Sequence, residues 1–177
     1  IPPIDLLIVN LYPFAETVAR PNCTYDEAIE NIDIGGPAML RAAAKNHHSV
    51  TVVVDPADYP GLIAELDAND GSSSIDTRSQ LAAKAFAHTA RYDTMVSGYL
   101  LRREQAERFP DTLPLVYDKL RDLRYGENPH QRAALYVEPG ARSHVLSRVA
   151  KLHGRPLSFN NVLDLNSARM LLGDLEG

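Results

Sequence analysis

The sequence contains one cysteine and no tryptophan, and it has no long apolar run. A single cysteine, Cys23, excludes an internal disulfide and a metal centre built from several thiolates, which favours a reducing, cytoplasmic setting. No stretch approaches the roughly 20 apolar residues that a membrane span requires, and no run of lysine and arginine suggests a membrane surface. The formal net charge of -5 gives no electrostatic case for nucleic-acid binding. We therefore expect a small molecule or another protein subunit as partner.

What is present is typical of a globular protein: 177 residues, 45% hydrophobic and 23% charged. Acidic residues outnumber basic ones in the first 110 positions, whereas the two are nearly balanced afterwards. The segment 102–114, where this balance of charge changes, is itself charged and contains two prolines. It therefore predicts a boundary between two units. The chain opens on Ile1-Pro2-Pro3 without an initiator methionine, so we expect it to be a piece of a longer protein.

The first part of the chain has the pattern of a parallel α/β sheet. The apolar run 5–10 and the β-branched run 49–54 predict short strands that are buried on both faces. Helical patterns follow Thr24, where Glu27 completes a capping box, and occupy 37–46, 59–66 and, from a cap at Asp76, residues 76–104. Strands and helices that alternate in this order predict parallel pairing with right-handed crossovers.

The segment 31–46, NIDIGGPAMLRAAAKN, combines an acid, a glycine pair and a cationic helix. Glycines allow a ligand to approach closely, Pro37 suits a first helical position, and a helix N-terminus attracts anions. Arg41 and Lys45 lie four residues apart, where like charges repel unless an anion lies between them. Alternatively, both cations complement the negative end of the helix dipole. The sequence leaves both interpretations open.

Two further groups of polar residues follow strands or helices. Asn10 and Tyr12 lie where the first strand ends, which is where ligands bind in open α/β sheets, although both residues could also serve a turn. His47 and His48 follow the cationic helix without a cysteine or carboxylate at ligand spacing. They are more typical of a solvated turn than of a metal site.

The second part of the chain contains the polar motif RYGENPHQ at 124–131. Arg124 suits bidentate contact with phosphate, and Tyr125 can stack or donate a hydrogen bond. An Arg124–Glu127 ion pair in a polar turn is the alternative. Around this motif the pattern predicts a strand or short helix at 115–123, a strand at 133–137, a strand or helix at 145–152, and a helix at 164–175.

Three separate motifs, NLYPF at 10–14, IDIGG followed by RAAAKNH at 32–47, and RYGENPHQ, resemble the bifunctional AICAR transformylase/IMP cyclohydrolase family of purine biosynthesis. The resemblance implies an α/β chain with a partial methylglyoxal-synthase-like parallel sheet to about residue 55, then helical structure. It implies that residues 1–112 are the later part of the cyclohydrolase domain. Residues 113–177 would be the first segment of a cytidine-deaminase-like transformylase domain.

The family resemblance also implies residue roles. Lys45, Asp33 and Tyr12 correspond to catalytic residues of ring closure. Contacts to the nucleotide substrates fall on the positions matching Val9, Asn10, Ile34, Arg124, Tyr125 and Asn161. Asn161 could equally be a loop amide near the cap of the next helix. Asp33 and Lys45 are roughly 18 Å apart if the chain between them is helical, so one shared pocket requires a turn at Gly35-Gly36-Pro37.

The implied function is formyl transfer from the co-substrate 10-formyltetrahydrofolate to AICAR, followed by cyclisation of formyl-AICAR to IMP with loss of water. It needs no metal. AICAR, formyl-AICAR and IMP are the implied ligands, the parent enzyme would be a cytoplasmic homodimer, and neither nucleic acid nor membrane is expected. We expect the isolated chain to be inactive, because further motifs of the family are not found in it. The alternative is a non-catalytic, anion-binding regulatory module of the methylglyoxal-synthase-like fold.

Overall fold

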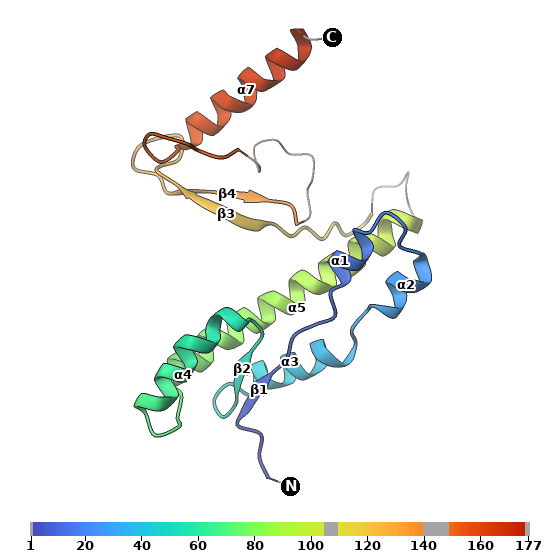
Figure 1. The fold of residues 1–177 in the computed structure, drawn as a ribbon, viewed down its shortest axis with the longest axis vertical. Coiled ribbons are helices and arrows are strands. Elements are labelled where there is room, and N and C mark those ends of the chain that lie inside the picture. The colour runs from blue at the N-terminus through green and yellow to red at the C-terminus, as the bar shows by residue number, and fades with distance from the viewer. Residues whose placement is uncertain (1, 105–109, 140–148, 176–177) are drawn as a thin grey trace. The chain divides into compact units, whose positions relative to one another are not determined.

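The computed structural model describes residues 2–104, 110–139 and 149–175. The chain divides into two compact units, residues 1–114 and 115–177. Figure 1 shows their helices and strands. The division falls close to the boundary expected near residue 112. That the two units correspond to the two domains of the family stays a prediction.

The first unit contains the predicted parallel sheet in reduced form. Strand β1 (Leu6–Ile8) pairs in parallel with β2 (Thr51–Val53), and Leu7 lies opposite Val52. Both strands are three residues long, shorter than the runs from which they were predicted. Strand β2 is buried throughout, as expected for a strand that is covered on both faces.

The prediction that β1 is also buried on both faces is wrong. Leu6 and Ile8 are 41% and 51% exposed, whereas the alternate residues Leu7 and Val9 pack against the main core cluster. Side chains alternate between the faces of a strand, so only one face of β1 is covered within the described residues. A continuous apolar run does not distinguish a strand that is covered on one face from one covered on both.

Helix α3 (Gly35–Lys45) follows β1 through two short helices and lies against β2 and the long helix of the unit. Its inward residues, Leu40, Ala43 and Ala44, are buried. The helix begins two residues before the predicted start, so Gly35 and Gly36 are helical and Pro37 is the third helical residue. Proline is tolerated there because the first N–H groups of a helix have no intrahelical acceptor.

Helix α5 (Ile75–Glu104) has 30 residues and is therefore about 45 Å long. It passes α3, β2 and α1, as Figure 1 shows. Leu81, Ala82 and Ala85 from the predicted apolar stripe are buried, whereas Phe86 is 39% exposed. The predicted cap at Asp76 is wrong, because the Ser74 hydroxyl accepts the Thr77 N–H at 3.2 Å and caps the helix instead.

Short helices complete the first unit. They are α1 (Phe14–Val18), α2 (Tyr25–Glu30), the 3-10 helix η1 (Pro56–Asp58) and α4 (Tyr59–Ala68). The capping box between Thr24 and Glu27 is confirmed, with both reciprocal hydrogen bonds present. Helix α1 was not predicted, since five residues after a proline carry little periodic signal. Its buried Phe14 packs edge-on against Tyr92 and Tyr99 of α5.

Among its described residues, the second unit has an antiparallel pair, β3 (Asp118–Leu123) and β4 (Ala133–Val137), and the helix α7 (Phe159–Leu175). Strand β4 has the predicted bounds, and the open choice at 115–123 is decided in favour of a strand at 118–123. The first half of the predicted element at 145–152 lies outside the described residues, and 149–152 has no regular structure. Helix α7 begins five residues before the predicted start at Asp164.

Candidate functional site

The loop after β1 carries the first group of predicted site residues. Val9 continues the pairing, because its N–H donates to the Val53 carbonyl at 3.1 Å. Asn10 is exposed, and its side-chain oxygen accepts the Leu11 N–H at 2.9 Å. Tyr12 is 58% exposed. The chain thus places these residues at the carboxyl end of β1, where a parallel sheet leaves room for a ligand.

Asp33 joins this loop to the start of α3. One carboxylate oxygen accepts the Gly36 N–H at 2.8 Å, and the other accepts the Tyr12 N–H at 3.3 Å. A β-carbon on Gly36 would come within 2.6 Å of Leu11 Cδ2 and 2.7 Å of Asp33 Oδ2. A larger residue at position 36 would therefore force the Leu11 side chain and the Asp33 carboxylate to move. The two remaining lone-pair sites of Asp33 stay free for another donor.

The structure brings Val9, Asn10, Tyr12, Asp33 and Ile34 to one end of the first unit, and Ile34 is 77% exposed there. It does not bring Lys45 to them. The predicted turn at Gly35-Gly36-Pro37 is wrong, because these residues open a helix that runs without interruption to Lys45. Eleven helical residues separate the two ends by about 15 Å. Only a ligand lying along α3 could contact both Asp33 and Lys45.

The cationic pair of α3 does not require an anion. The Arg41 guanidinium lies over the Phe86 ring of α5, with Cζ 5.5 Å from the ring centroid. This cation–π contact draws Arg41 towards α5. Lys45 is exposed and makes no ion pair with another described residue. Its position in the last turn suits the helix dipole, the alternative that the sequence left open.

In the second unit, the 124–131 motif is the loop between β3 and β4. The Gly126 N–H donates to the Gln131 carbonyl at 2.9 Å, and the Asn128 N–H donates to the Gln131 side-chain oxygen at 2.8 Å. A β-carbon on Gly126 would lie 3.0 Å from Gln131 Cβ, so this position favours glycine. The loop is thus closed by its own backbone and by one glutamine.

Arg124 and Tyr125 form the polar part of this loop. The guanidinium lies over the Tyr125 ring, 4.8 Å from its centroid, and donates to the Tyr125 hydroxyl at 3.2 Å. This hydrogen bond, the Ser158 hydroxyl and the positive charge of Arg124 lower the pKa of Tyr125. The described residues show no ion pair between Arg124 and Glu127, so that alternative is not supported.

Asn161 belongs to the start of α7, and backbone hydrogen bonds connect this part of the chain to Arg124 and Tyr125. The Arg124 N–H donates to the Leu157 carbonyl at 2.7 Å, and the Phe159 N–H donates to the Tyr125 carbonyl at 3.0 Å. The side-chain oxygen of Asn161 accepts the Ser158 N–H, while the Ser158 hydroxyl accepts the Asn161 N–H. Asn161 is the third residue of α7 and not the loop amide that the sequence left as an alternative, although its side chain caps the helix start together with Ser158. The same cluster holds Arg124 and Tyr125.

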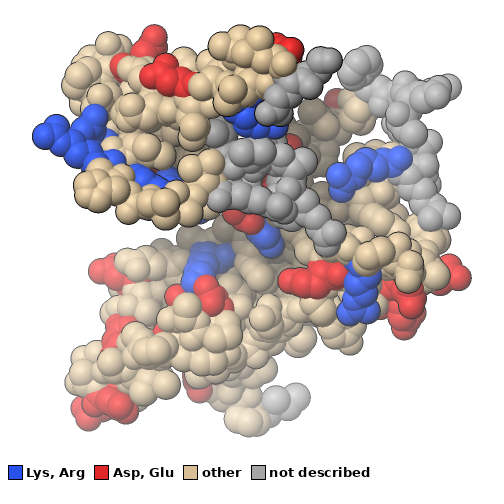
Figure 2. Space-filling model, turned by 45° about the horizontal axis from the view of Figure 1, so that its top comes forward, with Lys and Arg blue, Asp and Glu red and all other residues tan. Residues whose placement is uncertain are grey.

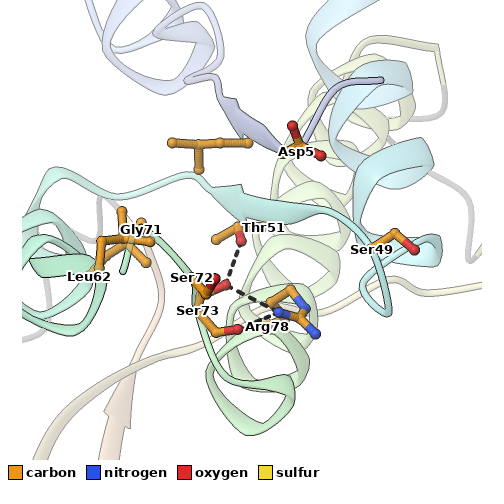
Figure 3. Close-up of a pocket in the computed structure, with 10 residues that line it drawn as sticks. Asp5, Ser49, Thr51, Leu62, Gly71, Ser72, Ser73 and Arg78 are labelled. Carbon is orange, nitrogen blue, oxygen red and sulfur yellow. Dashed lines mark hydrogen bonds between the residues drawn. The ribbon is translucent and has the colours of Figure 1, made fainter. Parts of the chain in front are cut away.

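A pocket of about 340 Å³ lies at the other end of the small sheet, next to Asp5, Leu6 and Thr51. Figure 3 shows Arg78 beside Ser73 at its wall. The guanidinium already donates to the carbonyls of His47 and Ser73, so Arg78 ties α5 to the neighbouring loops. None of the predicted site residues lines this pocket.

Sequence reasoning missed a charged cluster at the carboxyl end of β2. Lys84 Nζ lies 2.7 Å from Asp55 and 2.8 Å from Asp58, and His88 lies one turn further along α5. The hydrogen bond from Lys84 lowers the pKa of Asp55, and the bonds to both acids raise the pKa of Lys84. Burial lowers the pKa of His88. An aspartate directly after a buried strand was the available signal.

The comparisons with known proteins agree with the resemblance in the sequence. The family model "AICARFT/IMPCHase bienzyme" matches residues 43–176, and the chain belongs to this family. Lys45, Arg124, Tyr125 and Asn161 lie inside the matched residues, whereas Tyr12 and Asp33 lie before them. Membership points to an enzyme of purine biosynthesis.

A solved structure supports the fold. The chain is similar to the crystal structure of ForH, with 36% sequence identity and a TM-score of 0.50. The similarity covers 56% of this chain and 51% of the ForH chain. The chain thus spans about half the length of that relative, and the relative is a related but different protein.

Three general features of the described residues are the nature of their helices, their metal-ligating side chains and their surface charge. No helix in this part of the chain is long and apolar enough to cross a membrane. No group of three or more metal-ligating side chains comes together among the same residues. On the face shown in Figure 2, acidic and basic side chains are interspersed among uncharged ones.

Proposed function

We propose that this chain supplies part of a bifunctional enzyme, with residues of an IMP cyclohydrolase in the first unit and of an AICAR transformylase in the second. The observation that carries the proposal is the family match, which runs from α3 through α7 and therefore includes elements of both units. The parent enzyme would be a cytoplasmic homodimer that requires no metal. No observation favours the regulatory-module alternative.

For ring closure, we assign Asp33, Tyr12 and Lys45 to the chemistry. The carboxamide nitrogen of formyl-AICAR attacks the formyl carbon and loses a proton, which leaves a hydroxyl on that carbon. This hydroxyl leaves as water while the formamide nitrogen loses its proton, and IMP results. Asp33 would take the proton from the carboxamide nitrogen, and Tyr12 would stabilise charge that develops on the formyl carbonyl. Val9, Asn10 and Ile34 would contact the nucleotide beside them. Lys45 would exchange protons with the substrate from the far end of α3, which requires the nucleotide to lie along this helix.

For formyl transfer, we assign nucleotide binding to Arg124, Tyr125 and Asn161. Arg124 is exposed and presents donors that suit a phosphate, and the Tyr125 ring can stack on a base. Backbone hydrogen bonds to residues 157 and 159, together with the hydrogen bond between Gly126 and Gln131, hold the backbone of Arg124 and Tyr125 in place. The formyl donor would be 10-formyltetrahydrofolate.

Calorimetric titration with AICAR tests the assignment in the second unit. In the complete enzyme that carries this chain, Arg124→Ala should weaken AICAR binding by about 2 kcal/mol, or roughly 30-fold, because a charge-assisted hydrogen bond is lost. Arg132→Ala, an exposed arginine after the motif, is the matched control and should bind normally. Unchanged affinity in Arg124→Ala would make Arg124 a structural partner of Tyr125 only.

A further inference from the structure

Tyr92 of α5 connects the core of the first unit to the predicted catalytic acid. Its side chain is buried, with 7% of the residue exposed, and its ring packs edge-on against Phe14 at a centroid distance of 6.3 Å. The ring belongs to the core cluster formed with Phe14 and Ala28. Replacing tyrosine by phenylalanine would leave this packing in place, so the hydroxyl needs a separate explanation.

The hydroxyl makes two hydrogen bonds to one short segment. It accepts the Asp33 N–H at 2.7 Å and donates to the Asn31 carbonyl at 3.2 Å. Burial raises the pKa of Tyr92, so the phenol keeps the proton that it donates. The hydroxyl oxygen of Tyr92 therefore fixes the backbone on both sides of Ile32, although Tyr92 and Asp33 are 59 positions apart in the sequence.

The fixed backbone also determines where the Asp33 carboxylate lies. Its two oxygens accept the N–H groups of Gly36 and Tyr12. A shift of residue 33 would break both bonds and separate the carboxylate from the loop that carries Tyr12. The contacts thus run from the Tyr92 hydroxyl to the Asp33 backbone, and from the Asp33 carboxylate to the Tyr12 loop.

We propose that Tyr92 is a positioning residue for ring closure, which holds the Asp33 carboxylate beside the Tyr12 loop through its hydroxyl. The effect of Tyr92 on ring closure rests on the proposed function, whereas its effect on the position of the Asp33 carboxylate does not. Tyr92 itself does not touch the substrate. A carboxylate displaced by about 1 Å can lose on the order of 100-fold in rate, so a single hydroxyl remote from the substrate can matter.

Hydrogen exchange of the 177-residue chain tests the geometric part. In Tyr92→Phe, exchange of the Asp33 and Gly36 amides should accelerate at least about tenfold, because the first loses its acceptor and the second loses a fixed partner. Tyr99→Phe is the matched control, because Tyr99 also packs edge-on against Phe14, at 5.6 Å, and its hydroxyl does not bond to 31–33. Unchanged exchange at Asp33 in Tyr92→Phe would overturn the inference.

Kinetics of formyl-AICAR cyclisation by the complete enzyme test the catalytic part. We expect Tyr92→Phe to lower kcat by about 10- to 100-fold with little change in KM, and Tyr99→Phe to leave both unchanged. Wild-type kcat in Tyr92→Phe would overturn the positioning role. An unmodified enzyme without cyclisation activity would refute the proposed function instead, and the exchange result would still decide the geometry.

A third measurement needs no substitution and covers the case in which Tyr92→Phe does not fold. In the unmodified chain, the Tyr92 hydroxyl proton should exchange slowly and show a nuclear Overhauser effect to the Asp33 amide proton. A hydroxyl that exchanges rapidly and lies far from this amide would contradict the proposal.

Discussion

Gly36 shows how much a single residue of the candidate site could be predicted. The sequence indicated that a Gly-Gly pair after an acid permits close approach, and this is correct for Gly36. The group expected to approach was a ligand, and this part of the interpretation is wrong. The neighbours are Leu11 and the Asp33 carboxylate rather than a ligand, because the loop after β1 returns over the start of α3. Such a contact depends on tertiary packing, which local sequence does not encode.

The two glycines should respond in opposite ways to the same substitution. Gly36→Ala places a β-carbon 2.6 Å from Leu11 Cδ2 and should destabilise the chain by about 1–3 kcal/mol. Gly35→Ala meets nothing within 4 Å and should stabilise it by up to about 1 kcal/mol, since alanine favours a helix. Urea unfolding at equilibrium measures both. A Gly36→Ala variant as stable as Gly35→Ala would contradict the described packing.

Lys84 should make the stability of the first unit depend on pH. The lowered pKa of Asp55 contributes stability above its unfolded value of about 3.9, and this is lost as the pH falls through the folded value. The raised pKa of Lys84 contributes stability below about 10.4, which is lost as the pH rises. Both effects should be modest and weakened by salt, since Lys84 and Asp55 are 41% and 42% exposed.

Replacing Lys84 by methionine tests this explanation. The difference in urea midpoint between pH 7 and pH 3 should become smaller in Lys84→Met, although the Ala57 N–H still supports the Asp55 carboxylate. Lys119→Met, which removes an exposed i,i+3 pair in the second unit, is the control. An unchanged pH dependence in Lys84→Met would show that Lys84 does not stabilise the ionised Asp55.

Among the helices and strands, type was easier to predict than extent. The strand at 133–137, the capping box at Thr24 and the long helix to Glu104 follow from local pattern and are confirmed. The starts of α3 and α7 were misplaced, because side chains of Asp33 and Ser158 supply the hydrogen bonds that open these helices. In both cases the first helical residues, Gly-Gly-Pro and Phe-Asn-Asn, lack strong helix propensity.

The cap of α7 can be tested within the same helix. Ser158→Ala removes the acceptor of the Asn161 N–H and should lower the stability of the second unit by about 1 kcal/mol. Ser167→Ala removes a hydroxyl that bonds back to the Leu163 carbonyl in mid-helix, and should be near neutral or slightly stabilising. Denaturation followed by helical circular dichroism compares the two. Equal losses would indicate that Ser158 does not act as the cap.

For the whole chain, the sequence predicted two units, and the structure shows two, but the active sites were predictable only through the family resemblance. Composition and periodicity identified polar residues at a strand end and in a loop. They could not show that Asp33 and Lys45 lie at opposite ends of one helix, because the Gly-Gly-Pro sequence suits a turn and a helix start equally. The assignment of one reaction to each unit is the proposal most in need of a test.

Parallel assays of both half-reactions in Lys45→Ala and Arg124→Ala versions of the complete enzyme provide that test most directly. Lys45→Ala should lower formyl-AICAR cyclisation by about 100-fold or more, as expected for loss of an acid–base group, and should leave formyl transfer and thermal stability unchanged. Arg124→Ala should lower formyl transfer and leave cyclisation unchanged. Equal loss of both reactions in either variant, or no loss in both, would contradict the assignment of the two reactions to the two units.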